Sequence, residues 1–271
     1  MSGTAGWLAA IYAQQFKVTM ASFIQYRAAL VIWLIGHVLE PLVYLVVWTT
    51  VTRSTGGEVG GFSAADFAAY FIVLMVVNHM TYTWVMYEYD YRVRQGTLSP
   101  ELLRPVHPIH SDIADNITSK LITLPGMLAI AGLMSLVFRP AIRAVPWAMA
   151  AFIPVVLLAF IVRFLTEWTL ALAAFWTTRV SALNQAYFMA MLFFSGQIAP
   201  LELLPQPVRA VAFVLPFRWT IGFPAELLLG RLTPAQAVTG VAMQLVWLAA
   251  GVALMRFVWR AGLRVYSAVG A

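Results

Sequence analysis

The residues most able to carry chemistry are four ionisable side chains that lie within long apolar stretches. Arg163 and Glu167 are four positions apart, so on a helix they share a face and can pair. His37 and Glu40 are three apart, also share a face, and precede Pro41, which frees a backbone carbonyl beside them. Because an ion is costly to bury in a bilayer, each pair either lines a substrate route or holds helices or subunits together. Both interpretations stay open.

No pattern of an enzyme or a metal site accompanies these residues. His107 and His110 have the spacing of ligands on a helix face, but Pro108 between them argues against a regular helix there. We therefore expect a solvated cytoplasmic loop rather than a metal site. The glycine-rich run at 55–61 lacks the Gly-Lys-Ser/Thr ending of a phosphate-binding loop, and there are no cysteines for thiol chemistry. We predict a non-enzymatic chain without a cofactor, so any ATP would be hydrolysed by another protein.

The composition indicates a lipid environment. Of 271 residues, 62% are hydrophobic and only 10% are charged, against about half and a quarter in soluble domains. A water-soluble fold could not hide so much apolar surface, so we predict an all-α integral membrane protein. The net charge of +6 is typical of Lys and Arg in cytoplasmic loops, and we expect no nucleic-acid partner.

The hydrophobic pattern predicts a single transmembrane domain over 1–271 with six spans. The chain before these spans, residues 7–26, has apolar residues at spacings of three and four and predicts an amphipathic helix at the membrane interface, with an extension of the first span as the alternative. Six prolines in 200–234 preclude a continuous helix and predict short re-entrant external helices at 205–214 and 219–229. The predicted spans are 28–51, 67–87, 121–138, 147–177, 182–198 and 235–259.

The distribution of Lys and Arg favours one orientation. If the N-terminus is inside, ten of the 17 lie on the inner side, six on the outer side, and Arg163 lies within the membrane. Cytoplasmic loops carry the excess of such residues, so we predict a multi-pass protein of the cell membrane with both termini cytoplasmic. The inner group is Lys17, Arg27, Arg92, Arg94, Arg104, Lys120, Arg179, Arg256, Arg260 and Arg264, and the outer group is Arg53, Arg139, Arg143, Arg209, Arg218 and Arg231.

The loop at 97–110, between the second and third spans, has the residues of a short rigid helix. Ser99 can cap its start, Pro100 suits the first position, and Glu101 favours the positive end of the helix dipole. Pro105 ends the helix after about one and a half turns, which gives a short rigid knob with two adjacent leucines, Leu102 and Leu103, exposed for a partner. An ordinary stabilised loop is the alternative.

The run from Arg94 to Val106, RQGTLSPELLRPV, resembles the signature of the permeases of type-2 ABC transporters, the ABC-2 family. It is most similar to the branch named after its LLRP motif, formerly a domain of unknown function. The resemblance extends in outline over the whole chain, with the N-terminal interfacial helix and the Tyr26-Arg27 pair at the start of the first span. It also includes the proline-broken segment, with Gly196 to Pro200, then Pro205, Pro216 and Trp219.

The resemblance implies an exporter subunit that moves a lipophilic or amphipathic substrate. Such permeases pair with themselves or with a related second permease, a heterodimer in most cases of this branch, and two ABC ATPase subunits that hold ATP and Mg dock beneath them. The short external helices would close the path at Gly196, Pro200, Pro216 and Trp219. The coupling helix that contacts the ATPase would consist of Ser99, Pro100, Glu101, Leu102, Leu103, Arg104 and Pro105.

Two other classes of protein remain. An ion-coupled secondary transporter would place ionisable residues at mid-membrane on broken helices, and Arg163 and Glu167 are candidates for such residues. Transporters of this class often carry inverted repeats, and we find no convincing repeat in this sequence. A membrane-embedded enzyme or assembly factor would cluster His, Asp or Ser at one membrane face, for which only the segment 107–115 offers candidates. Drug, lipid, glycolipid and peptide all stay open as substrates.

Overall fold

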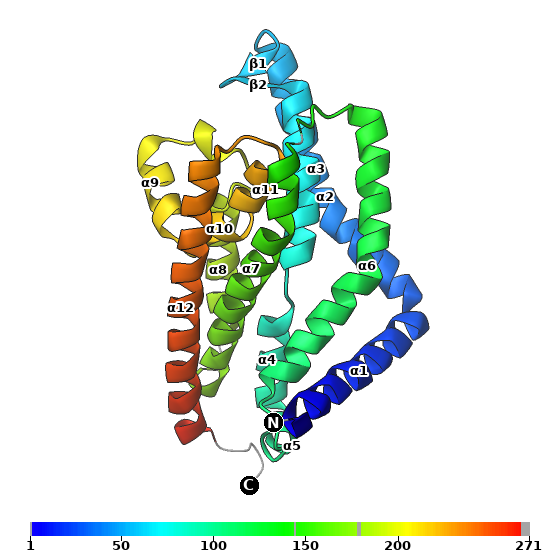
Figure 1. The fold of residues 1–271 in the computed structure, drawn as a ribbon, viewed down its shortest axis with the longest axis vertical. Coiled ribbons are helices and arrows are strands. Elements are labelled where there is room, and N and C mark those ends of the chain that lie inside the picture. Colours follow the sequence, from blue (N-terminus) through cyan, green and yellow to red (C-terminus); the bar gives the residue numbers. More distant parts are fainter. Residues whose placement is uncertain (1, 144, 178–179, 267–271) are drawn as a thin grey trace.

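The computed structural model describes residues 2–143, 145–177 and 180–266 and shows an all-α membrane protein (Figure 1). The first half contains α1 (Ser2–Gln25), α2 (Arg27–Ser54), β1 (Glu58–Val59), β2 (Phe62–Ser63), α3 (Ala64–Thr81), α4 (Val85–Arg94), α5 (Leu98–Leu102) and α6 (Ile109–Phe138). The second half contains α7 (Pro146–Ala171), α8 (Val180–Phe194), α9 (Gln206–Val214), α10 (Pro216–Thr220), α11 (Gly222–Leu228) and α12 (Pro234–Val265). Short 3-10 turns follow α7 (Leu172–Phe175) and α8 (Leu201–Leu203), and β1 and β2 form an antiparallel pair of two-residue strands.

Five stretches of the described chain are helical, long and apolar enough to cross a membrane. They are Val31–Ser54, Ala64–Arg94, Ile109–Phe138, Pro146–Phe175 and Pro234–Val265. They correspond to the first four and the last of the six predicted spans. The remaining predicted span, 182–198, is the shorter apolar helix α8 of 15 residues, which measures about 22 Å at 1.5 Å per residue.

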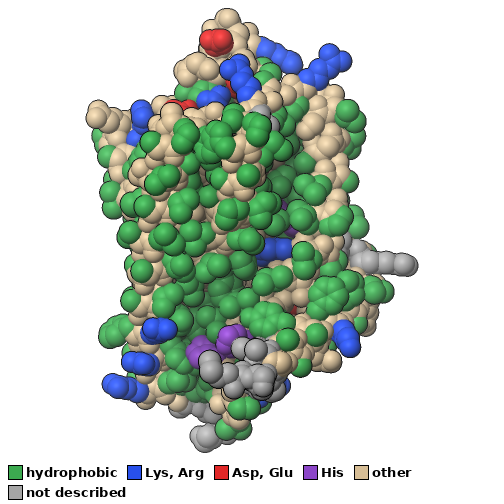
Figure 2. Space-filling view, in the orientation of Figure 1, with side chains coloured by type: hydrophobic (Ala, Val, Ile, Leu, Met, Phe, Trp, Pro, Cys, Tyr) green, Lys and Arg blue, Asp and Glu red, His purple; other side chains and the backbone are tan. Residues whose placement is uncertain are grey.

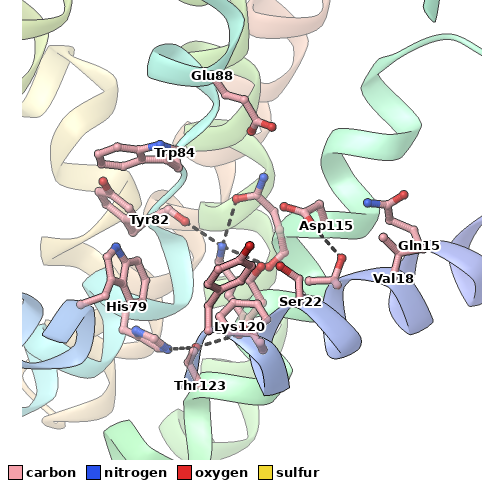
Figure 3. A pocket seen from close by; sticks show the side chains of 16 residues that line it. Gln15, Val18, Ser22, His79, Tyr82, Trp84, Glu88, Asp115, Lys120 and Thr123 are labelled. Carbon is pink, nitrogen blue, oxygen red and sulfur yellow. Dashed lines mark hydrogen bonds between the residues drawn. The ribbon is translucent and has the colours of Figure 1, made fainter. Parts of the chain in front are cut away.

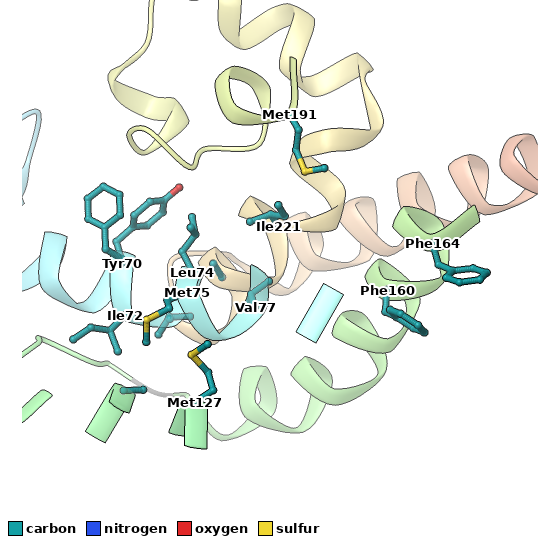
Figure 4. Close-up of a cluster of buried hydrophobic side chains, with 14 of the residues drawn as sticks. Tyr70, Ile72, Leu74, Met75, Val77, Met127, Phe160, Phe164, Met191 and Ile221 are labelled. Atoms are coloured by element: carbon teal, nitrogen blue, oxygen red, sulfur yellow. The ribbon is translucent and has the colours of Figure 1, made fainter. Parts of the chain in front are cut away.

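Helix α3 lies at the centre of the bundle and is buried over most of its length, because α2, α6, α7 and α11 all pack against it (Figure 1). Its Phe67 ring stacks on Trp48 of α2 with centroids 5.1 Å apart. Deeper in the same cluster, Leu74 and Met75 lie near Met127 of α6 (Figure 4). The core therefore follows this helix rather than filling a globular centre.

The outer surface is apolar in the middle and basic at both ends. Hydrophobic side chains cover the middle of the molecule, and Lys and Arg gather above and below (Figure 2). One end carries the α4–α5 segment and the end of α12, and the other carries the connections that follow α2, α6 and α8 (Figure 1). Of the predicted inner group, Arg92, Arg94, Arg104, Arg256, Arg260 and Arg264 share one end of the molecule, whereas Lys120 lies within the span formed by α6 and Arg179 lies outside the described residues.

Two helix boundaries differ from those expected. The span predicted at 67–87 is not continuous, because α3 ends at Thr81 and α4 begins only at Val85. The third span does not begin at residue 121, since α6 is helical from Ile109 and its first turns pack against α1. The polar residues of 109–120 are therefore buried or half-buried.

Two helix starts follow directly from local sequence. Ser63 and Asp66 form a reciprocal capping box that begins α3, with the Asp66 carboxylate accepting from the Ser63 backbone N–H at 3.0 Å. Thr233 and Gln236 form the same arrangement at α12, where Pro234 occupies the first helical position. Each box satisfies backbone donors that the helix cannot bond itself.

A glycine allows α12 to pack closely on α11. A Cβ atom at Gly240 would lie 2.1 Å from the Phe223 ring, which is a severe overlap. On the same helix, a Cβ atom at Gly251 would meet Leu165 at 3.6 Å, an ordinary contact.

We expect Gly240→Ala to lower the free energy of unfolding by about 1–3 kcal/mol, because the Phe223 ring is buried and must shift. Gly251→Ala is the matched control and should leave stability unchanged or slightly higher. Thermal unfolding of both variants in detergent checks this expectation. Equal midpoints for the two variants would contradict this view of α11–α12 packing.

Candidate functional site

The candidate site forms where the second membrane span is interrupted. Residues Tyr82 to Trp84 leave the helical conformation inside the candidate span Ala64–Arg94. An interrupted helix frees backbone groups, which in a membrane must be bonded by protein. Lys120 of α6 provides one such bond, since its Nζ donates to the Tyr82 carbonyl at 2.7 Å.

The buried ion pair on α7 lies beside this interruption. The Arg163 Nε donates to the Glu167 Oε1 at 2.7 Å, and the two side chains are only 2% and 0% exposed. The predicted pairing of these residues is therefore confirmed. The Arg163 Nη1 also donates to the Asn78 Oδ1 at 2.8 Å and to the Thr81 Oγ1 at 3.0 Å, at the end of α3.

Glu167 connects the same pair to two further segments. The Thr83 hydroxyl, within the interruption, donates to its Oε2. The Tyr187 hydroxyl of α8 donates to its Oε1 at 3.3 Å. The ion pair thus joins α7 to the end of α3, to the non-helical segment and to α8, so every oxygen of the buried carboxylate is bonded.

His37 and Glu40 of α2 line a cavity of about 300 Å³ together with Arg163 of α7. The His37 ring lies edge-on to Trp33, at 3.9 Å between centroids, and to Tyr82, at 4.8 Å. Glu40 is exposed, and within the described residues it forms no ion pair. Three of the four predicted intramembrane residues, His37, Glu40 and Arg163, therefore line one cavity. The fourth, Glu167, does not line it but pairs with Arg163.

The opposite wall of this cavity is apolar. It comes from α8, which contributes Phe188, Met189 and Leu192. Polar and charged groups on one side and flexible apolar groups on the other suit an amphipathic ligand, and a few hundred Å³ is a common size for a ligand site. The arrangement can bind and orient a molecule.

Helix α5 forms the predicted knob, but with different residues exposed. Ser99 does not cap it, because the helix begins at Leu98 after Thr97 and the Ser99 Oγ lies 2.8 Å from the Tyr266 hydroxyl. Leu102 is half-buried against the core, so our prediction that both leucines are exposed is wrong for this one. Leu103 is 88% exposed, and Arg104 and Pro105 beside it are exposed too.

A charged network holds α5 to the bundle. Arg92 of α4 pairs with Asp112 of α6 at 2.7 Å, with Glu88 at 2.9 Å and with Glu101 of α5 at 3.5 Å. Asp112 is buried and also accepts from the Trp168 indole N–H at 2.9 Å. The knob is therefore connected through Arg92 and Asp112 to α7, the helix that carries the buried ion pair.

The two histidines that follow α5, His107 and His110, contact different helices. The His107 ring packs against Trp259 of α12, with centroids 4.5 Å apart, and burial lowers its pKa. His110 lies on α6 with its Nδ1 3.4 Å from the Tyr12 hydroxyl of α1. The expectation of a solvated loop is therefore wrong, since both side chains are half-buried. The described residues contain no group of three or more His, Cys, Asp or Glu that could hold a metal.

The proline-broken segment folds back onto the bundle at the end opposite α5 (Figure 1). Gly196 has a φ of +91°, and its carbonyl accepts from the Tyr70 hydroxyl at 2.8 Å. Pro200 precedes the 3-10 turn Leu201–Leu203, and Pro216 begins α10. Trp219 is buried, and its carbonyl accepts from Gln244 of α12 at 2.8 Å.

The helices of this segment agree only partly with the predicted ones. The helix expected at 205–214 is α9, but the helix expected at 219–229 is divided into α10 and α11 by the non-helical Ile221. A second buried ion pair joins these two pieces, with the Arg218 Nη2 2.7 Å from the Glu226 Oε2. Burial raises the pKa of the Glu226 carboxyl to about 7, although Arg218 acts to lower it.

Several members of the site were missed from sequence. Asn78, Thr81, Thr83 and Tyr187 are uncharged, and Lys120 was placed in a cytoplasmic loop. The run Thr81-Tyr82-Thr83-Trp84 was the available signal, since β-branched and aromatic residues are poor helix formers.

These features define a multi-pass α-helical membrane protein with a charged centre and a rigid apolar knob at one end. A family model described as ABC-2 family transporter protein matches residues 38–270. The chain therefore belongs to the ABC-2 family of membrane permeases, whose members generally work with an ABC ATPase. A search of curated proteins finds no match to this sequence.

We expect Arg163→Met to destabilise the protein by about 3–5 kcal/mol, because it leaves the Glu167 carboxylate buried without its cation. The double variant Arg163→Met with Glu167→Met should recover part of this loss. Asp90→Asn, which removes a more exposed pair with Arg94 on α4, is the control and should cost less than about 1 kcal/mol. Thermal unfolding in detergent measures all three. A double variant less stable than the single one would contradict this assignment.

Glu226 should make the stability of the proline-broken segment depend on pH. Its folded pKa is about 7, above the ordinary value of 4.5, so its stabilising contribution is fully present below pH 4.5 and is lost as pH rises through about 7. We expect the unfolding midpoint of Glu226→Gln to fall less than that of the wild type between pH 5 and pH 8. Glu58→Gln, at an exposed carboxylate of β1, should behave as the wild type does. Parallel curves for wild type and Glu226→Gln would show that the buried carboxyl does not titrate in this range.

Proposed function

We propose that this chain is the permease subunit of an ATP-driven exporter and that α5 is the part that docks on the ATPase. The single observation that carries the proposal is the side chain of Leu103, which is 88% exposed directly after α5, a short helix that buried Leu98 and the Arg92–Glu101 pair hold to the bundle. An exposed leucine on a rigid support is typical of a contact site. Membership of the ABC-2 family names the kind of partner that such a contact would serve.

The chain would cross the membrane six times. Helix α7 runs toward the α5 end, whereas α12 begins at the opposite end, so α8 has to return the chain between them (Figure 1). Its 15 residues are short for a hydrocarbon core of about 30 Å, and the apolar turns that follow it add to the length of the crossing. This number of crossings places both termini on one side.

That side would be the cytoplasm. Helices α4 and α5 and the end of α12 share one end of the molecule. This end carries Arg92, Arg94, Arg256, Arg260 and Arg264 on α4 and α12, and Arg104 directly after α5. An excess of such residues is typical of cytoplasmic loops. The location would be the cell membrane.

The chemistry of the transporter would belong to its partners. Two ABC ATPase subunits would bind ATP and Mg, and this chain would act without an ATPase site of its own. A second permease, a related chain or another copy, would complete the path. The cavity between α2, α7 and α8, with Glu40 and Arg163 on one wall and Met189 on the other, would take a lipophilic or amphipathic substrate. The segment containing Gly196 and Trp219 would close the path outside.

We expect Leu103→Asp to reduce the ATPase that co-purifies with this chain from its native membrane by at least about tenfold, because a charge in an apolar contact costs more than about 1.4 kcal/mol. Gln95→Asp adds the same charge at an exposed position of the same end and should leave recovery unchanged. Mass spectrometry of the purified complexes provides the measurement.

Two results would contradict the proposal. Equal recovery of ATPase with Leu103→Asp would place the contact elsewhere. Folded wild-type protein that brings no ATPase, under conditions that preserve known complexes, would favour an ion-coupled transporter instead.

A further inference from the structure

A second cavity, of about 530 Å³, lies on the other side of the interruption between α3 and α4. Helices α1 and α6 form most of its walls (Figure 3). Tyr82 and Trp84 line both this cavity and the one near Glu40. Val18, Tyr26 and Trp33 line it and are exposed, so the cavity opens onto the surface between α1 and α2. This size matches that of a site for a whole small molecule or part of a lipid.

A lysine without a carboxylate partner lies in the polar wall. The Lys120 Nζ donates to the Tyr82 carbonyl at 2.7 Å, whereas its contacts with the two Asn116 oxygens are long, at 3.4 and 3.5 Å. It also lies 4.7 Å from the centre of the Phe160 ring. Lys120 is half-buried and forms no direct ion pair within the described residues, so the carboxylates of Asp115 and Glu167 act on it only from a distance. An ammonium group has three donors, and two of those of Lys120 make only these long contacts, so an anion can replace Asn116 as their acceptor.

The same wall carries the carboxylate of Asp115, which attracts Lys120 from a distance but makes no direct ion pair with it. The Asp115 Oδ1 accepts from the Thr19 hydroxyl of α1 at 2.7 Å, and the described residues hold no ion pair to it. Glu88 also lines the cavity, but Arg92 pairs with it at 2.9 Å. Lys120 and Asp115 are five residues apart on α6 and together carry no net charge. They therefore complement a zwitterion better than a simple anion or cation.

A buried histidine supports a polar ligand at the inner end of the cavity. His79 is 2% exposed and lines the cavity, and its Nε2 lies 3.0 Å from the Thr123 hydroxyl (Figure 3). Its Nδ1 has no hydrogen-bond partner among the described residues. A buried polar atom without a partner is rare and costly, which points to a ligand that can donate to or accept from it.

The remaining walls are apolar or aromatic and suit the upper part of a hydrocarbon chain. Val18 and Phe23 of α1 and Trp33 of α2 face the opening, with Tyr26 between them. Aromatic residues with one polar end favour the membrane interface, where headgroup and chain meet. The cavity thus combines a charged polar wall with a lateral apolar opening.

We propose that this cavity binds a zwitterionic membrane phospholipid, with its phosphate at Lys120 and its ammonium group at Asp115. The lipid chain leaves between α1 and α2. This site is separate from the substrate path proposed above, and the proposal does not depend on ATP-driven export.

Delipidated full-length protein in mild detergent can test the site by thermal shift and native mass spectrometry. We expect added phosphatidylethanolamine to bind and to raise the unfolding midpoint, and phosphatidylglycerol to do so less. Diacylglycerol, which lacks the phosphate, and inorganic phosphate, which lacks the chains, should both have no effect. Equal stabilisation by diacylglycerol would overturn the role of the headgroup, and stabilisation by inorganic phosphate alone would overturn the assignment to a lipid.

Variants locate the binding within the cavity. Lys120→Met should weaken phosphatidylethanolamine binding at least about tenfold, whereas Lys17→Met, at an exposed lysine of α1 outside the cavity, should not change it. Asp115→Asn should remove the preference for phosphatidylethanolamine over phosphatidylglycerol. Ser22→Phe partly fills the opening from an exposed position and should block binding even if Lys120→Met fails to fold. Unchanged binding by Ser22→Phe would overturn the proposal.

Discussion

The structure depends on one requirement, that every backbone group freed inside the membrane be bonded by protein. The second span breaks at Tyr82–Trp84, and charged side chains from two other helices converge on the break. Lys120 bonds the Tyr82 carbonyl, and Arg163 bonds the end of α3 while pairing with Glu167. Because these contacts join α3, α6, α7 and α8, the break organises the bundle rather than weakening it.

The residues of the break, Tyr82 and Trp84, lie between two cavities and line both. Through α4, the same residues are linked to the end of the molecule that carries α5. Helix α4 begins directly after it, and Arg92 of α4 holds both Glu101 of α5 and Asp112 of α6. A short non-helical segment between packed helices is a common location for a hinge. In the exporter that we propose, movement of α5 against an ATPase would reach Tyr82 and Trp84 through α4. Both residues line the two cavities, so their displacement would change the shape of each.

Membrane class, family and the Arg163–Glu167 pair could all be predicted from the sequence, because each depends on local pattern. Apolar runs of about 20 residues indicate spans, and a spacing of four places two side chains on one helix face. The break at Tyr82–Trp84 could not be located, since it depends on Lys120, 38 residues away, reaching the carbonyl of Tyr82. For the same reason Lys120 was assigned to a loop. Whether Leu102 or Leu103 is exposed depends on how α5 packs against its neighbours, which no local pattern determines.

The most direct test of the central claim uses the absence of cysteine from the chain. Leu103→Cys would introduce a single thiol at the tip of α5, and a cross-linker that joins cysteine to lysine would be applied to native membranes. The account predicts that position 103 is covalently joined to an ABC ATPase, identified by mass spectrometry, and that a membrane-impermeant maleimide added outside intact cells does not label it. Labelling of this cysteine from outside, or cross-links that never include an ATPase, would contradict the account.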